Sequence, residues 1–123
     1  MGRTSFGRVV FNGIEYGHDI VVCNGRVRRR RKELSAHMRP RYGHTPLAGE
    51  ELKTYLEECG RPEVIFVGTG VYGALPLTED TEELFKELSQ AGVEIVKSVT
   101  NDGLLTMVER EQRRYLAVIH VTC

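Results

Sequence analysis

The glycines that follow a short apolar run are the first residues in the sequence able to bind a small molecule. Val64-Ile65-Phe66-Val67 leads into Gly68-x-Gly70-x-x-Gly73. Glycine permits positive φ and a close backbone approach, so that backbone N–H groups can bind an anion. In open α/β sheets, ligands lie outside the carboxyl ends of the strands. If this protein has a site for a small molecule or anion, we therefore expect its ligand-binding residues to be Gly68, Thr69, Gly70, Tyr72 and Gly73.

This glycine spacing also spells the dinucleotide fingerprint, but its surroundings do not fit that cofactor. In a dinucleotide-binding fold the helix opens inside the motif, whereas here Pro76 and the helix caps at Thr78 and Asp80 delay it. The next apolar run, 93–96, ends in Lys97-Ser98 and offers no carboxylate for a ribose hydroxyl. We predict no cofactor. The first interpretation of the loop is a purely structural turn, and anion binding by its backbone N–H groups is the alternative.

A dense basic run, Arg26-Val27-Arg28-Arg29-Arg30-Arg31-Lys32, is the second feature that could bind a partner. It could grip phosphates or dock onto an acidic protein surface. The plainer alternative is a solvated loop paired with the acidic faces of nearby helices. The balanced net charge and the single nearby aromatic, Tyr42, weigh against nucleic acid. We predict an interaction surface that folding does not require, formed by Arg28, Arg29, Arg30, Arg31 and Lys32.

Histidines, cysteines and hydroxyls could also do chemistry, but their spacing assigns them none. No pair has the ligand spacing of a zinc site, and His120 and Cys123 should point to opposite faces of an extended chain, so no metal site is predicted. Thr69 or Tyr72 beside His18 or Asp19 would make a nucleophile and its base. Because the sequence does not show that these residues meet, we assign no catalytic residue.

The three cysteines, Cys23, Cys59 and Cys123, have unrelated spacings and are odd in number. We expect free thiols, with Cys59 in the core, in a reduced cytoplasmic protein. No apolar run approaches the roughly 18 residues that would span a bilayer, and the first residues lack the apolar core of a secretory signal.

The length of the chain predicts a single domain over residues 1–123. Its charge is unevenly distributed along the sequence. Residues 1–45 carry ten Lys/Arg against three Asp/Glu, and residues 46–123 carry seven against fourteen. The net charge of zero is therefore the sum of +7 in residues 1–45 and −7 in residues 46–123. Such a molecule could self-associate or meet a charged partner, as a monomer or a homodimer.

The elements that must position these residues begin with a β-meander. Apolar runs at 6–11, 14–16, 19–23 and 26–28 are separated by the turn formers Asn12-Gly13 and Asn24-Gly25. Residues 29–46 have little apolar content and predict a long loop. Thr45-Pro46 then predicts a helix cap, and Gly60 the end of that helix.

The rest of the chain predicts strands at 64–67, 93–96 and 115–121, with helices capped by Thr78 and Thr100 between them. Strand, helix, strand, helix, strand is a pair of right-handed crossover units, in which the strand at 64–67 is parallel to its neighbours and buried on both faces. The fold class is α/β.

Several short motifs resemble the Mth-type domain family, which includes an adipogenesis-associated protein and a mitochondrial complex I assembly factor. The similar segments are Tyr16-Gly17-His18-Asp19, Val64 to Gly70, Ala74-Leu75-Pro76-Leu77 and the ending His120-Val121-Thr122-Cys123. The resemblance implies a three-layer α/β fold with a mixed central sheet and an additional amino-terminal β-layer. It implies no established catalytic activity.

We therefore expect a non-catalytic binding or assembly module that recognises a protein partner. The alternative is a protein, enzyme or not, that binds a small molecule or anion in the loop 68–73. A third hypothesis is nucleic-acid binding through residues 26–42.

Overall fold

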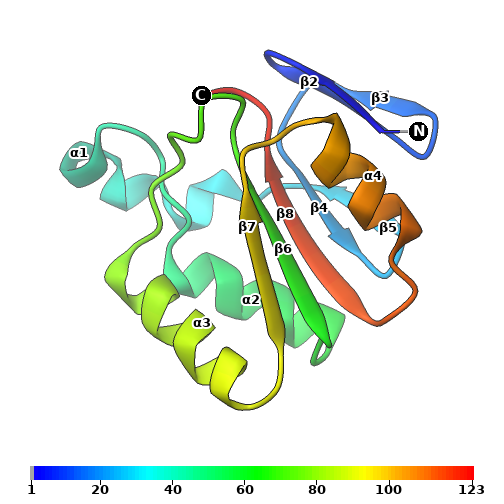
Figure 1. Cartoon of the computed structure of the whole chain (residues 1–123). Coiled ribbons are helices and arrows are strands. Elements are labelled where there is room, and N and C mark those ends of the chain that lie inside the picture. Colours follow the sequence, from blue (N-terminus) through cyan, green and yellow to red (C-terminus); the bar gives the residue numbers. More distant parts are fainter. Residues whose placement is uncertain (1) are drawn as a thin grey trace.

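The computed structural model describes residues 2–123, which form three layers around a mixed five-stranded sheet (Figure 1). The strand order is β5 (Arg26–Arg29), β4 (Ile20–Cys23), β8 (Tyr115–His120), β6 (Val64–Thr69) and β7 (Glu94–Ser98). β6 is parallel to β7 and β8, whereas β4 is antiparallel to β5 and β8. The predicted three-layer α/β class with a mixed central sheet is confirmed.

β6 is covered on both faces, as its uninterrupted apolar run predicts. Val64 and Phe66 belong to one hydrophobic core, and Ile65 and Val67 to the other. This alternation follows from the two-residue period of a strand. The same period divides β4 and β8 between the two cores, so three adjacent strands separate them.

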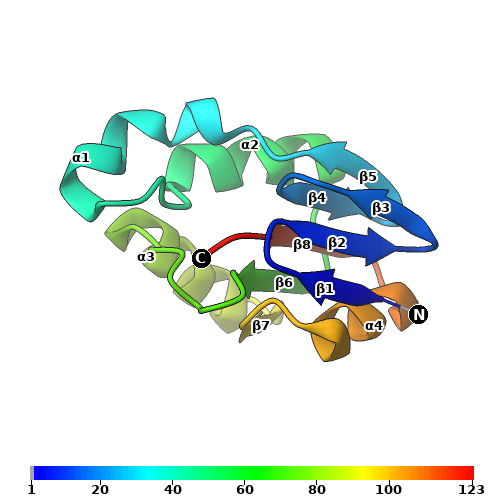
Figure 2. The ribbon, with the colours of Figure 1, turned by 90° about the horizontal axis from the view of Figure 1, so that it is seen from above.

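On one face lies a smaller sheet of β1 (Arg3–Ser5), β2 (Arg8–Phe11) and β3 (Ile14–Tyr16), beside helix α4 (Asp102–Arg110) (Figure 2). The turn between β2 and β3 has positive φ at both Asn12 and Gly13, as a type I′ turn requires. The predicted meander is wrong at two points. β1 was not predicted, and β4 and β5 leave the meander for the central sheet, where β4 is covered on both faces.

The other face is covered by α2 (Gly49–Cys59) and α3 (Glu79–Gln90). Thr78 caps α3 as predicted, since its hydroxyl accepts a hydrogen bond from the Thr81 N–H. The predicted cap at Thr45 is wrong, because a parallel bridge between Leu47 and Leu77 keeps the chain extended up to residue 48. For α4, the cap is Asn101 in place of Thr100.

The predicted loop 29–46 contains three short helical segments: two 3₁₀ turns, Lys32–Leu34 and Ala36–Met38, and α1 (Arg39–Tyr42). Its middle is anchored by the fully buried Ser35. The segment is therefore ordered by a contact with the core that its polar composition does not reveal.

The expectation of three free thiols is also wrong. A disulfide joins Cys23, at the end of β4, to Cys59, at the end of α2, with their Cα atoms 5.8 Å apart. Cys123 is a free thiol. The number and spacing of the cysteines did not predict this pairing. The two partners are 36 residues apart and meet only in the tertiary structure. In residues 2–123, the helices lack the length and apolar character that a bilayer crossing requires.

Candidate functional site

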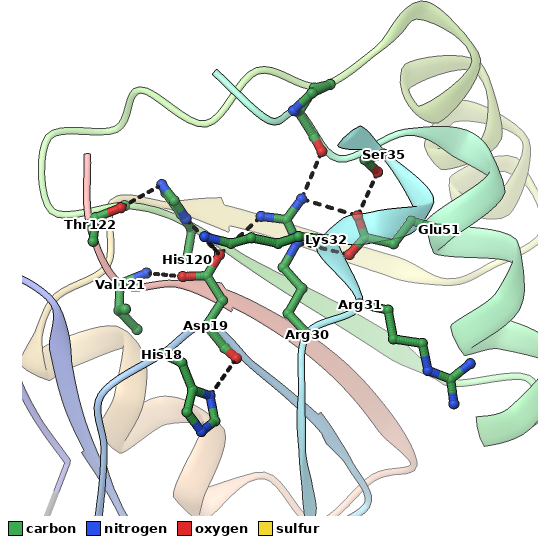
Figure 3. A network of polar contacts seen from close by, with 12 residues as sticks. His18, Asp19, Arg30, Arg31, Lys32, Ser35, Glu51, His120, Val121 and Thr122 are labelled. Carbon is green, nitrogen blue, oxygen red and sulfur yellow. Dashed lines mark hydrogen bonds and ion pairs between the residues drawn. The ribbon is translucent and has the colours of Figure 1, made fainter. Parts of the chain in front are cut away.

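Strand register brings three ionisable residues together at one end of the central sheet. In β4, Ile20 pairs with Ile119 of β8 and with Arg29 of β5. The next residues outward, Asp19, His120 and Arg30, therefore lie opposite one another (Figure 3). By the two-residue alternation, their side chains point to the face covered by α2. This is also the end at which the parallel strands β6 and β8 finish.

The Arg30 guanidinium is the centre of the cluster. Its Nη1 donates to Asp19 Oδ2 at 3.0 Å, and its Nε and Nη2 donate to the two oxygens of Glu51 at 2.8 and 3.0 Å. Nη2 also donates to the Pro46 carbonyl at 2.7 Å. The Arg30 side chain is fully buried, so the prediction that it forms part of a dispensable exposed surface is wrong. Burial disfavours the charged form, but Glu51 and Asp19 outweigh it and raise the pKa of Arg30.

Glu51 ties this cluster to α2 and to the loop. Besides Arg30, its carboxylate accepts hydrogen bonds from the Ser35 hydroxyl at 2.6 Å and from the Tyr55 hydroxyl at 2.5 Å. Burial, together with the negative charge of Glu51, raises the pKa of Tyr55 far above its ordinary value. Ser35 in turn accepts from the Ala48 N–H at 3.0 Å, which fixes the chain immediately before α2.

Asp19 joins Arg30 to the imidazole of His120. Its Oδ2 lies 2.7 Å from His120 Nδ1, and its Oδ1 accepts from the Val121 N–H at 2.8 Å. Burial alone would raise the pKa of Asp19. The hydrogen bond and charge of His120, the Val121 N–H and Arg30 outweigh burial and hold that pKa well below the ordinary 3.8. The second imidazole nitrogen, Nε2, lies 3.3 Å from the Thr122 hydroxyl.

A cavity of about 340 Å³ opens beside this row. It is lined by Gly17, His18, Asp19, Arg29, Arg30, Lys32, Glu33, Val121 and Thr122. Arg29 makes no ion pair within residues 2–123, and the Lys32 ammonium lies 3.5 Å from Asp19 Oδ2. Because the Asp19 oxygens are already engaged, the charged side chains left to a ligand are the two cations Arg29 and Lys32 and the carboxylate of Glu33, beside the Thr122 hydroxyl.

Nucleophilic catalysis needs a hydroxyl, a base beside it and a carboxylate that orients the base. These three groups are present here in Thr122, His120 and Asp19. Two features weaken this arrangement as a catalytic device. The Thr122–His120 contact of 3.3 Å joins residues two apart in the chain. Asp19 Oδ2 is also shared with Arg30, which offsets the negative charge that would support an imidazolium. The geometry is better suited to holding an anion than to activating a nucleophile.

The predicted glycine loop is occupied by the chain itself. The N–H groups of Tyr72 and Ala74 donate to the Cys123 oxygen at 3.2 and 2.8 Å, and the Val71 N–H donates to the Thr122 carbonyl at 2.7 Å. At Gly70, φ is +101° and an added Cβ would lie 2.3 Å from the Cys123 carbonyl carbon. The loop therefore clamps residues 122 and 123.

The side chains of that loop have separate partners. The Thr69 hydroxyl donates to the Ser98 carbonyl at 3.2 Å, and an added Cβ at Gly68 would meet the Thr100 hydroxyl. Tyr72 is 74% exposed, with its ring centroid 6.0 Å from that of Phe6. Neither Thr69 nor Tyr72 joins His18 or Asp19. Ligand binding by the predicted loop stays a prediction.

The residues of the predicted interaction surface, 28–32, have four kinds of surroundings. Arg28 and Arg29 are exposed on β5, and Arg30 is buried. Arg31 donates to Glu58 of α2 at 2.6 Å. The solvated-loop interpretation of this run predicts such a pairing with an acidic helix face. Lys32 lies at the cavity. Among residues 2–123, no group of three or more His, Cys, Asp or Glu side chains could hold a metal ion.

Glu51 and Ser35 were not predicted as site residues, although Glu51 left a signal in the sequence. It stands four residues before Tyr55 on the apolar face of α2, and a carboxylate on a buried face requires a cation. His120 and Thr122 left no such signal, because their roles depend on the pairing of β8 with β4.

No family model and no curated protein matches the chain, but solved structures do. A conserved hypothetical protein, PH1505 from Pyrococcus horikoshii OT3, is 36% identical over 98% of this chain and 96% of its own, with a TM-score of 0.78. MT938 is also 36% identical, over 100% of this chain and 98% of its own, with a TM-score of 0.72. XCC1710 from Xanthomonas campestris is 13% identical over 97% of this chain and 83% of its own, with a TM-score of 0.57, and shows the fold alone. The identity and the nearly complete coverage show that this chain belongs to the family of PH1505 and MT938.

Proposed function

We propose that this protein binds a small anionic molecule, without catalysis, in the cavity beside Asp19. The observation that carries the proposal is that two cations, Arg29 and Lys32, line the same cavity as Thr122. The cavity volume of about 340 Å³ suits a small carboxylate or phosphate compound. The ligand is an anion, as in the sequence-based hypothesis, but its proposed site is the cavity beside Asp19 and not the glycine loop.

The electrostatics of the cavity favour an anion. Asp19 is held ionised by Arg30 and His120, so that its charge is balanced inside the protein. Arg29 has no carboxylate partner within residues 2–123 and can turn its planar fork to a carboxylate or phosphate. The hydroxyl of Thr122 adds a donor whose position is fixed by the clamp on its carbonyl.

Calorimetric titration at low ionic strength with inorganic phosphate and with citrate tests this function. We expect saturable binding by the wild type and a loss of about tenfold in affinity in Arg29→Gln, a change equivalent to about 1.4 kcal/mol. Arg28→Gln is the matched control, because Arg28 is an adjacent exposed arginine that lies outside this cavity. Equal losses in the two variants, or no binding of either anion, would overturn the proposal.

A second function, recognition of an acidic protein segment, is favoured by the edge strand. β5 has a neighbour on one side only, and Arg26, Arg28 and Arg29 make no ion pair within the described part of the chain. An extended acidic peptide could add to this edge by β-augmentation. Fluorescence anisotropy with a labelled poly-glutamate peptide and with a single-stranded RNA separates this function from nucleic-acid binding, since the RNA should bind more weakly.

We propose further that the family of PH1505 is the Mth-type domain family and that this protein acts in the cytoplasm. The first proposal is supported by the motifs at 16–19, 64–70, 74–77 and 120–123. Mass spectrometry of proteins captured by the tagged chain in its native cells would test the second proposal, by naming a partner and its compartment.

A further inference from the structure

The Cys23–Cys59 disulfide borders a second, smaller pocket on the α2 side of the sheet. The pocket encloses about 50 Å³ over a floor that includes Val21 and Leu116. Both cysteines line it, and both are partly exposed. The pocket therefore gives a small molecule a place beside two partly exposed cysteines.

The pocket rim is strongly basic. Arg26 pairs with Cys23 across the two strands, and Arg28 pairs with Val21, so both side chains project to the face on which the disulfide lies. Neither arginine makes an ion pair within residues 2–123. Arg31 also lines the pocket, but Glu58 neutralises it at 2.6 Å. The field at the disulfide is therefore positive and attracts anions.

We propose that Cys23–Cys59 is an exchange site for small thiols that carry carboxylates. The arginines would bind the carboxylates and bring the thiol of the same molecule to the disulfide. The exchange site does not depend on the anion proposed for the Asp19 cavity, because that cavity contains neither sulfur, although Arg29 lines both spaces.

The exchange step requires no outside oxidant. The thiolate sulfur of the small molecule forms a bond to Cys59 Sγ, the Cys23–Cys59 bond breaks, and its electron pair leaves on Cys23 as a thiolate. Cys23 is the better leaving group because a thiolate there is stabilised by Arg26 and by Asn24 Nδ2, which lies 3.8 Å from its sulfur. Cys59 follows Glu58, whose negative charge opposes a thiolate. The sulfur that leaves as the more stable thiolate leaves faster.

Competition among three thiols tests the proposal. The oxidised protein, in a Cys123→Ser background, is mixed at low ionic strength with glutathione, 2-mercaptoethanol or cysteamine at equal thiolate concentrations. The reaction is stopped with acid, and mixed disulfides are measured by intact and peptide mass spectrometry. We expect the anionic glutathione to react about tenfold faster than the neutral and cationic thiols, with the adduct on Cys59.

The paired variant Arg26→Gln/Arg28→Gln should remove this preference, so that the three thiols react at similar rates. All three should react more slowly than 2-mercaptoethanol reacts with the wild type, because Arg26 no longer stabilises the leaving Cys23 thiolate. Arg3→Gln, which removes an exposed arginine from β1, should keep the preference. Circular dichroism shows whether each variant is folded. Equal rates with the three thiols, an adduct on Cys23, or three free thiols in the purified wild type would each overturn the proposal.

Discussion

At the scale of single residues, the buried Arg30 bears most directly on stability. Its guanidinium and the carboxylates of Asp19 and Glu51 are nearly or completely inaccessible to solvent. Each charge in such a cluster is tolerated only because its partners are present. Removing one member leaves the others buried and uncompensated, which typically costs about 3–5 kcal/mol.

Arg30→Gln should therefore lower the free energy of unfolding by about 3–5 kcal/mol, measured by urea denaturation at neutral pH. Arg29→Gln removes the neighbouring charge at an exposed position and should change stability by less than about 0.5 kcal/mol. Similar effects of the two substitutions would mean that the Arg30 cluster contributes nothing beyond an ordinary surface charge.

Asp19 should make the protein sensitive to acid. Its pKa in the folded state is lowered, so its contribution is complete above the unfolded-state value of about 3.9 and is lost as pH falls from there through the folded pKa. Urea denaturation at pH 5, 4 and 3 should show falling stability in the wild type and a flatter dependence in Asp19→Asn.

A surface carboxylate supplies the control for that experiment. Arg113 holds the pKa of Glu111 at about 2. Arg113 is 46% exposed and Glu111 is 12% exposed, so this pair lies at the surface and should be screened in roughly 0.5 M salt, whereas the buried Asp19 should not. An acid dependence that disappears at high salt would assign the effect to the surface and would contradict the role of Asp19.

At the scale of elements, those with a strong local signal could be predicted from the sequence. The apolar run of β6 and the cap Thr78 are local patterns, and the structure confirms both. The start of α2 could not be predicted, because the bridge between Leu47 and Leu77 overrides the cap residues at Thr45-Pro46. β1 has no apolar pattern and owes its existence to its pairing with β2.

The site was harder to predict than the elements because its members meet through register. Asp19 and His120 are 101 residues apart, and their contact depends on which strand lies beside β4. The position of Arg30 within a run of five basic residues gave no sign that its side chain alone is buried. A single sequence shows which residues of a strand share a face of the sheet. It does not show which residues of neighbouring strands lie opposite one another.

The clamp formed by the loop after β6 makes a prediction at this scale. Gly70→Ala should lower stability in two ways. The positive φ strains an alanine by about 1–2 kcal/mol, and the added Cβ clashes with the backbone of Cys123. Gly7→Ala is the control, because Gly7 has φ of +80° and open space around its Cβ position. In urea denaturation Gly70→Ala should lose clearly more stability than Gly7→Ala. Equal losses would show that residues 122 and 123 move aside without cost.

At the scale of the whole molecule, the two hydrophobic cores share the strands that separate them. β4, β6 and β8 each contribute alternate side chains to both cores. Loss of one core would expose one face of all three strands, so the amino-terminal layer and the α2–α3 layer should unfold together. A single cooperative transition is the rule for domains of this size.

Phe11→Ala tests this coupling. Phe11 is 0% exposed in β2, and its truncation should cost about 3–5 kcal/mol, whereas Phe6→Ala, at a residue 56% exposed, should cost little. Hydrogen exchange then shows how far the loss reaches. If the layers are coupled, the most protected amides of α3 and β6 should lose the same free energy of protection as those of β2, because all of them exchange through global unfolding. Unchanged protection in α3 would show that the amino-terminal layer opens as a separate unit, and the shared strands would then stabilise each core independently.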